Sequence, residues 1–412
     1  MLNDEVIDKV IERLVNRIES ANTYVLREIS KRVKRIGTIS ATDRHQLVQM
    51  LKYGGDFDKI LKELARLTDL NVYDIYEIFD EVAKSDYEFA KHFYDYRDIK
   101  YIPYSKNLEL QAQVRALATI TAQEYMNIAN TTLLGFGFQD ASGNVTYKGL
   151  KEAYYDLLDE AVLSISQGKE TFESAMARQL TSIGESGLKV IYPTTYIDKN
   201  GIVKHHTRRL DSATRMNMVT ALSNLHNEIQ QQIGDDIGAD GWEISVHEFP
   251  ADDHQEAQGR QFSKEEFDKL QTTGVAKTYQ GKIIDMHNGE FFRPISDYNC
   301  KHFEFAIILG VDNPAYSEKQ LREIRDRNDT GFYLFDKKLG DYKHYTMYEG
   351  TQLQRKIETE IRTQKDIEMM AKESNNEEML ANAHKKITAL KHKYKELSDA
   401  SGLKRKSARL RV

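Results

Sequence analysis

The sequence predicts an α+β protein with a mostly helical N-terminal region, a small mixed α+β central domain and long C-terminal helices. All five prolines lie between residues 103 and 314, so about the first and last hundred residues lack the strongest helix breaker. Strand-forming and turn-forming residues alternate between 190 and 206, and helical periodicity returns after 348. We therefore expect a helical N-terminal region for partner docking, an α+β core and C-terminal helices with a basic tail, over 1–183, 184–347 and 348–412.

The N-terminal region is expected to be a series of helices. Apolar residues recur at steps of three and four over 4–35, with Asp4 as a candidate N-cap and a basic last turn before Gly37. The same criteria predict further helices over 43–54, 57–68, 107–132 and 149–182. Glycine-rich composition identifies 135–137 and 142–144 as turns.

Aromatic residues are dense between 72 and 104. Each ring buries a large area, so this density favours packing between helices, with a protein-binding face as the sharper alternative. The residues are Tyr73, Tyr76, Phe79, Tyr87, Phe89, Phe93, Tyr94, Tyr96, Tyr101 and Tyr104.

The central part has the composition of strands and turns. Residues 190–197 and 202–206 flank the turn-forming sequence Asp-Lys-Asn-Gly, which predicts a β-hairpin. A helix over 212–233, a strand over 242–247 and a short helix after Ser263 are expected to follow.

The C-terminal part is predicted to be helical over 348–397, with a break near Ser374-Asn375-Asn376. Its second half carries an apolar seam of less than three heptads. This length favours packing within the chain, with a short coiled coil as the alternative. The seam consists of Leu380, Ala383, Ile387, Leu390, Tyr394 and Leu397.

Composition excludes several classes of protein. A single cysteine rules out a disulfide framework and suits a reducing compartment. No run approaches the roughly 20 apolar residues of a membrane span, and the N-terminus lacks the pattern of a signal peptide, so we expect no membrane association. The net charge of −6 does not favour general nucleic-acid binding.

One group of residues has the donor types of a metal site: His247, His254, Cys300 and His302. Cys300 and His302 are two residues apart, so on an extended chain their side chains point to the same side. A thiolate with imidazoles suits tetrahedral zinc, although the spacing matches no zinc-finger pattern. The alternative is a buried polar network without a cofactor. We also find no nucleophile, phosphate-loop or metalloprotease motif, and therefore expect no enzyme.

The C-terminal tail has a charge opposite to that of the whole chain. Residues 385–412 contain ten basic and two acidic residues, a local charge of +8. Such a tail attracts DNA phosphates without reading the base sequence, the alternative being a solvated helix end with a disordered terminus. The candidate DNA contacts are Lys385, Lys386, Lys391, Lys393, Lys395, Lys404, Arg405, Lys406, Arg409 and Arg411.

Several ordered motifs resemble the minor capsid proteins of tailed phages related to the Mu F-like head morphogenesis proteins. They are Ser245-Val246-His247 followed by His254 and Gln258-Gly259, the Asn299-Cys300-Lys301-His302 element, and the helix start over 352–365. The resemblance extends over nearly the full length. The chain departs from the family pattern at 249–253, Ala257 and Asp297, which favours a structural role for the histidines and the cysteine.

The resemblance implies a virion component inside the phage head, near the portal vertex, that is assembled in the bacterial cytoplasm. Its implied partners are the portal protein, major capsid or scaffolding proteins, and packaged double-stranded DNA during assembly or ejection. The alternative function is a metal-dependent hydrolase or toxin-like enzyme that uses the His/Cys group with zinc.

Overall fold

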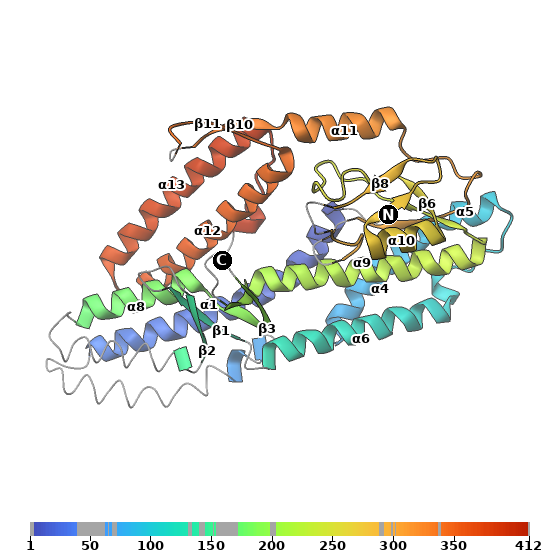
Figure 1. Cartoon of the computed structure of the whole chain (residues 1–412). Coiled ribbons are helices and arrows are strands. Elements are labelled where there is room, and N and C mark those ends of the chain that lie inside the picture. Colours follow the sequence, from blue (N-terminus) through green and yellow to red (C-terminus); the bar gives the residue numbers. More distant parts are fainter. Residues whose placement is uncertain are drawn as a thin grey trace.

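The computed structural model describes residues 4–38, 62–64, 66–67, 72–130, 134–139, 145–150, 152–153, 172–197, 203–287, 292–297, 300, 302–336 and 339–410. Long helices dominate the molecule, and four small antiparallel sheets lie among them (Figure 1). The predicted α+β class and the long C-terminal helices are confirmed. The helices predicted over 43–54 and largely over 57–68 lie outside the described residues.

Four helices form the main helical layer. They are α1 (Asp4–Thr38), α4 (Val72–Phe89), α6 (Leu108–Asn130) and α9 (Leu210–Ile237), and α9 contacts each of the other three. Helices α6 and α9 run lengthwise through Figure 1. Ile11, Val15 and Ile18 of the predicted stripe on α1 are buried, so the periodicity of the sequence identified the core side of this helix.

The aromatic segment packs mainly within the molecule. It covers α4, α5 (Lys91–Tyr96) and the short 3₁₀ helix η1 (Tyr104–Lys106). The rings of Tyr87 and Tyr101 stack at 5.3 Å, and Tyr94 meets Tyr101 edge-on at the same distance. The buried hydroxyls of Tyr94 and Tyr104 donate to Asp236 and Asp80. These contacts support helix packing as the role of the aromatic cluster.

A four-stranded antiparallel sheet has the order β2-β1-β3-β4. The predicted hairpin is confirmed as β3 (Lys189–Ile197) and β4 (Val203–Arg209), and its register shifts between Ile191 and Thr195. Pro193 lies at this shift, where its missing N–H removes a ladder hydrogen bond.

The turn predicted at 135–137 is wrong, because these residues belong to β1 (Leu134–Gln139), which pairs with β2 (Val145–Gly149). Gly137 is needed here for space, since a Cβ would lie 2.8 Å from Tyr147 of the neighbouring strand. Gly137, which suggested a turn, instead allows close approach across the sheet. Helix α8 (Phe172–Ser186) precedes β3.

The central part carries a three-stranded sheet of order β6-β5-β9, formed by β5 (Gly241–Ile244), β6 (Gln261–Ser263) and β9 (Glu304–Ile307). The expected strand over 242–247 stops at Ile244, so Ser245, Val246 and His247 lie in the loop beyond it. The short helix expected after Ser263 is α10 (Lys264–Thr273), and Ser263 caps it by accepting a hydrogen bond from Glu266 N–H. The two-stranded sheet of β7 (Val275–Lys277) and β8 (Ile283–Asp285) follows.

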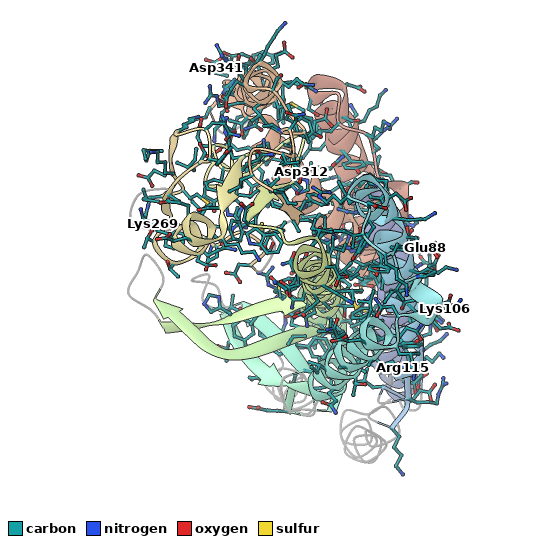
Figure 2. The ribbon with its side chains drawn as sticks, turned by 90° about the vertical axis from the view of Figure 1, so that its right-hand side faces the viewer. Glu88, Lys106, Arg115, Lys269, Asp312 and Asp341 are labelled. Carbon is teal, nitrogen blue, oxygen red and sulfur yellow. The ribbon has the colours of Figure 1, made fainter. Side chains whose placement is uncertain are left out.

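Figure 2 views the molecule along its length and separates the central part from the N-terminal helices. Lys269 of α10 lies on one side, and Glu88, Lys106 and Arg115 lie on the other. Asp312 lies between them and accepts two hydrogen bonds from Arg97, which ties the end of α5 to the central part.

The chain ends in an antiparallel helix pair, α12 (Met347–Ser374) and α13 (Glu377–Ser401). The predicted break is confirmed, since Asn375 adopts a left-handed conformation and Asn376 caps α13. The seam packs against α12 within the same chain, with Ala383, Ile387, Tyr394 and Leu397 buried. Helix α11 (Glu318–Thr330) and the hairpin of β10 (Phe332–Asp336) and β11 (Asp341–Tyr345) precede this pair.

One hydrophobic cluster runs through all three predicted parts, from Ile11 of α1 through Leu222 of α9 to Ala383 of α13. The first sheet also combines strands from both sides of residue 183. The domain boundaries remain a prediction, but the described core is shared between the parts. No helix in the described ranges is long and apolar enough to cross a membrane.

Candidate His/Cys site

Two loops at one end of the three-stranded sheet form the site. The first loop follows β5 and contains a helical turn, in which Gln258 N–H donates to the carbonyl of His254. This turn places His254 and Gln258 on the same side. The second loop leads into β9 and contains Cys300 and His302. Ser245 joins the loops, because its N–H donates to Phe303 O and its hydroxyl accepts from Phe303 N–H, both at 2.8 Å.

Gly259 closes the first loop in a conformation that requires glycine. Its φ is +66°, and a Cβ would lie 2.5 Å from Leu321 and 2.8 Å from Val246. Its N–H donates to Ile244 O, which returns the chain to the sheet. The Ser-x-His and Gln-Gly motifs therefore have structural roles that sequence reasoning did not assign to them.

Three of the four predicted residues meet in the interior. Cys300 Sγ lies 3.5 Å from His254 Nδ1 and 3.5 Å from His302 Nδ1. The donor atoms of the three residues all lie within 4.8 Å of one another. His254, Cys300 and His302 are 1%, 2% and 3% exposed, so the cluster is shielded from bulk water.

His247 lies beside the cluster and outside this group of three. Its ring is 4.5 Å from that of His302 in an edge-on arrangement, and its side chain is half-buried. Of the four predicted residues, three therefore lie at the centre of the site and His247 lies at its edge.

Hydrogen bonds to the outer nitrogens fix the orientation of both central imidazoles. His254 Nε2 donates to the carbonyl of Arg293 at 2.7 Å, because a carbonyl oxygen can only accept. His302 Nε2 donates to Gln258 Oε1 at 3.3 Å. The Gln258 amide is itself oriented by His247 N–H, which donates to the same oxygen at 2.9 Å.

Burial controls the charge of the site. It lowers the pKa of His254, against the opposing effect of the Asp253 carboxylate. It also raises the pKa of the Cys300 thiol, although the backbone N–H groups of His302 and Ser296 hydrogen-bond the sulfur and work in the other direction. A buried thiol with a raised pKa is a poor nucleophile, which argues against cysteine catalysis.

A cavity of about 1300 Å³ adjoins the cluster and is lined by all four predicted residues. Basic residues outnumber acidic ones along its wall. Arg215 of α9, Arg355 of α12, and Lys404, Lys406 and Arg409 of the C-terminal tail take part. The cavity therefore connects the His/Cys site with the basic tail, and no pattern in the sequence predicted this connection.

The predicted DNA contacts lie on two segments. Lys385, Lys386, Lys391, Lys393 and Lys395 are exposed on α13, and Lys386 pairs with Glu185 at 3.5 Å. Lys404, Arg405 and Lys406 are exposed after α13, Arg409 is half-buried, and Arg411 lies outside the described residues.

The segment after α13 folds back on α12. Arg362 donates to the carbonyl of Arg409 at 2.7 Å, and Lys365 donates to that of Leu410. The short 3₁₀ helix η2 (Ser407–Leu410) forms there. The described part of the tail is therefore an ordered element rather than a disordered terminus.

A buried ionic network next to the cavity was missed by sequence reasoning. Arg209 contacts both Asp211 and Asp366, and Arg362 contacts Asp211. Burial acts to raise the pKa of Asp211, but Arg209 and Arg362 together hold it below its ordinary value. Asp366 lies 157 residues from Arg209 in the sequence, so no local pattern could have revealed that the two meet.

Comparison with known proteins decides the family. A family model described as phage minor capsid protein 2 matches residues 2–399. The chain belongs to the phage minor capsid protein 2 family. The resemblance found in the sequence is thereby confirmed over nearly the whole chain, while no curated protein and no solved structure matches it.

Membership of the phage minor capsid protein 2 family makes the chain a structural phage protein and a component of the virion. It implies association with other components of the head. In this family member, two of the three ordered motifs lie in the loops that hold His254 and Cys300, and the third, over 352–365, lies on α12.

Proposed function

We propose that this minor capsid protein lies inside the head of a tailed phage, at the portal vertex, and contacts packaged DNA through its C-terminal part. The observation that carries the DNA contact is the ordered basic surface of α13 and the segment after it. Lysines occupy the solvent side of α13, opposite the buried seam. Fixed positive charges bind phosphates through release of counterions.

The DNA contact is tested by substitutions that remove positive charge and leave the buried residues of the fold unchanged. Deletion of 385–412 would also remove buried residues such as Tyr394, so it is a poor test. We instead use a quadruple variant with glutamine at Lys391, Lys393, Lys395 and Arg405. The control carries glutamine at the exposed lysines Lys84, Lys106, Lys269 and Lys277.

The proposal predicts that the wild-type protein binds double-stranded DNA with an affinity that falls steeply with salt. Each lost phosphate contact lowers the slope of log affinity against log salt by about 0.9. The quadruple variant should have a lower slope and the control the wild-type slope. Equal slopes in the two variants would remove the tail from the proposal.

For the contact with the portal protein we propose the aromatic face of the β10–β11 hairpin. Tyr333, Phe335 and Tyr342 are at least half exposed, and Phe335 and Tyr342 face each other across the strands. Exposed apolar patches of this kind mark protein-binding sites. Most of the N-terminal aromatics that the structure describes, in contrast, lie in the hydrophobic core or pack against it.

The portal contact is tested by co-expression with the portal protein of the same phage. The wild-type chain should co-purify with it, and the Tyr333→Ser/Tyr342→Ser variant should not. Phe89→Ser, at another exposed ring, is the control. Absence of the wild-type chain from purified virions would contradict the location, and co-purification of the double variant would contradict the assigned surface.

We further propose that the protein acts without catalysis. The support is the burial of Cys300 in the interior and the structural use of the family motifs. Assembly in the bacterial cytoplasm is part of the same proposal. It agrees with the single cysteine, Cys300, which forms no disulfide bond.

A further inference from the structure

We propose that His254, Cys300 and His302 bind one zinc ion. This inference is independent of the proposed contacts with the portal and DNA, since it concerns two loops of the central part. It rests on two observations: the separation of the donor atoms and the orientation of the imidazoles.

The donor separations fit a tetrahedral ion. Zinc binds thiolate at about 2.3 Å and imidazole at about 2.0–2.1 Å, which at a tetrahedral angle places sulfur about 3.5 Å from each nitrogen. Cys300 Sγ lies 3.5 Å from Nδ1 of both His254 and His302. One sulfur with two nitrogens also matches the ligand preference of zinc.

Both imidazoles present the nitrogen that a metal requires. The outer Nε2 of His254 donates to Arg293 O, and that of His302 donates to Gln258 Oε1. In the neutral ring this leaves the lone pair on Nδ1, which faces Cys300. Metal-bound histidines characteristically donate their second N–H to a carbonyl or carboxylate in this way.

A hydrogen-bond network alone accounts for the geometry less well. The neutral thiol has one proton, which can serve only one of its two contacts with imidazole nitrogen. A zinc ion satisfies both, because the thiol loses its proton to solvent and sulfur and the two nitrogens each form a bond to the metal.

The surroundings hold the loops in place. Arg293, whose carbonyl orients His254, pairs through its guanidinium with Asp253 at 3.2 Å. Ser296 has a left-handed backbone with φ of 65°, and its hydroxyl donates to His302 O. Zinc at this point would join the loop after β5 to the loop before β9.

The three proposed ligands leave the fourth position of a tetrahedral zinc ion open. His247 and the three proposed ligands all line the cavity, and His247 lies against His302. We assign His247 to the edge of the site, not to its anchoring ligands. His247→Ala should therefore retain zinc, whereas loss of Cys300 or His302 should release it.

The test is elemental analysis of the full-length protein, purified through a histidine-free tag from cells grown with added zinc. The expected result is one zinc per chain in the wild type and in His247→Ala, and a substoichiometric amount in Cys300→Ala and His302→Ala. His226→Gln is the matched control, because His226 is equally buried but pairs with Asp86 elsewhere in the molecule.

Cobalt substitution gives a second measurement. The wild-type protein should show thiolate-to-cobalt charge-transfer absorption that His226→Gln retains and Cys300→Ala loses. A folded wild-type chain without stoichiometric metal would overturn the proposal even if the variants failed to fold. Full zinc content in folded Cys300→Ala would overturn it as well.

Discussion

Arg209, the last residue of β4, donates a hydrogen bond from Nη2 to Oδ2 of Asp366 on α12 at 2.9 Å. Asp366 is completely buried and also accepts from Asn22 of α1 at 3.3 Å. Burial raises the pKa of Asp366, and Arg209 is the main opposing influence. This contact therefore joins the N-terminal helix, the central hairpin and the C-terminal helices at one charged point.

Removing Asp366 should destabilise the protein strongly. Asp366→Ala leaves Arg209 buried with one carboxylate partner fewer, and breaking a buried ion pair typically costs about 3–5 kcal/mol. Urea unfolding would measure the change in the free energy of unfolding. Asp326→Ala, at an exposed position of α11, is the control and should change it by less than about 0.5 kcal/mol. Equal effects of the two substitutions would refute a stabilising role for the network.

Glu19 should make stability depend on pH near neutrality. Burial, followed by the neighbouring Asp211, raises the pKa of Glu19 to about 7 even though Arg362 lies 3.9 Å away. Because the folded state holds the proton more tightly than the unfolded state, stability falls as pH rises from about 4.5 to about 7.

Glu19→Gln should lack this loss. The free energy of unfolding of the variant, relative to that of the wild type, should therefore rise between pH 5 and pH 8 by at most about 3 kcal/mol. Unfolding at the two pH values measures it, with the exposed Glu265→Gln as control. Burial also raises the pKa of Glu304 to about 7, so the stability of Glu19→Gln should still depend on pH in part. A constant difference between Glu19→Gln and wild type across this range would contradict the assignment.

Tyr394→Phe should loosen the segment after α13. The Tyr394 hydroxyl donates to Glu358 at 2.7 Å and accepts from Lys406 N–H at 2.9 Å. Its loss leaves a buried carboxylate and an amide without this partner, at a cost of about 1–3 kcal/mol. Hydrogen exchange of the Lys406 amide should accelerate, while exposed Tyr342→Phe should leave it unchanged. Unaltered exchange in Tyr394→Phe would show that the hydroxyl does not hold the segment.

Gly184→Ala should destabilise the contact between α8 and α12. The added Cβ would lie 2.6 Å from Ile367 Cγ1. Overpacking costs about 1–3 kcal/mol, which exceeds the gain of about 1 kcal/mol from the helix propensity of alanine. Thermal unfolding measures the balance, and Gly149→Ala, with open space around the new Cβ, is the control. The combination with Ile367→Ala should be less destabilising than the sum of the single changes.

The sequence predicted elements whose cause is local. The stripe on α1, the hairpin of β3 and β4, and the break at Asn375 follow from side-chain period, turn chemistry and capping, which neighbouring residues decide. The prediction failed at 135–137 because the same glycines suit a turn and a close contact between strands, and only Tyr147 on the other strand distinguishes the two cases.

For the candidate site, the sequence supplied the donor types but not their arrangement. The spacing of Cys300 and His302 predicted that they share a side, and the structure places both sulfur–nitrogen contacts at 3.5 Å. The sequence could not predict that Arg293 and Gln258 orient the imidazoles, or that His247 lies at the edge of the site. Those positions depend on the packing of two loops that are distant in the sequence.

The bond between Asn22 and Asp366 spans 344 residues, and α1 also reaches Glu373 through Arg27. A ribosome adds about 5–20 residues per second, so α1 waits roughly 20–70 s for this partner. During that interval the side of α1 that later meets α12 is uncovered. Until α12 is made, that side of α1 can associate with neighbouring chains, and the synthesis of α12 ends this period.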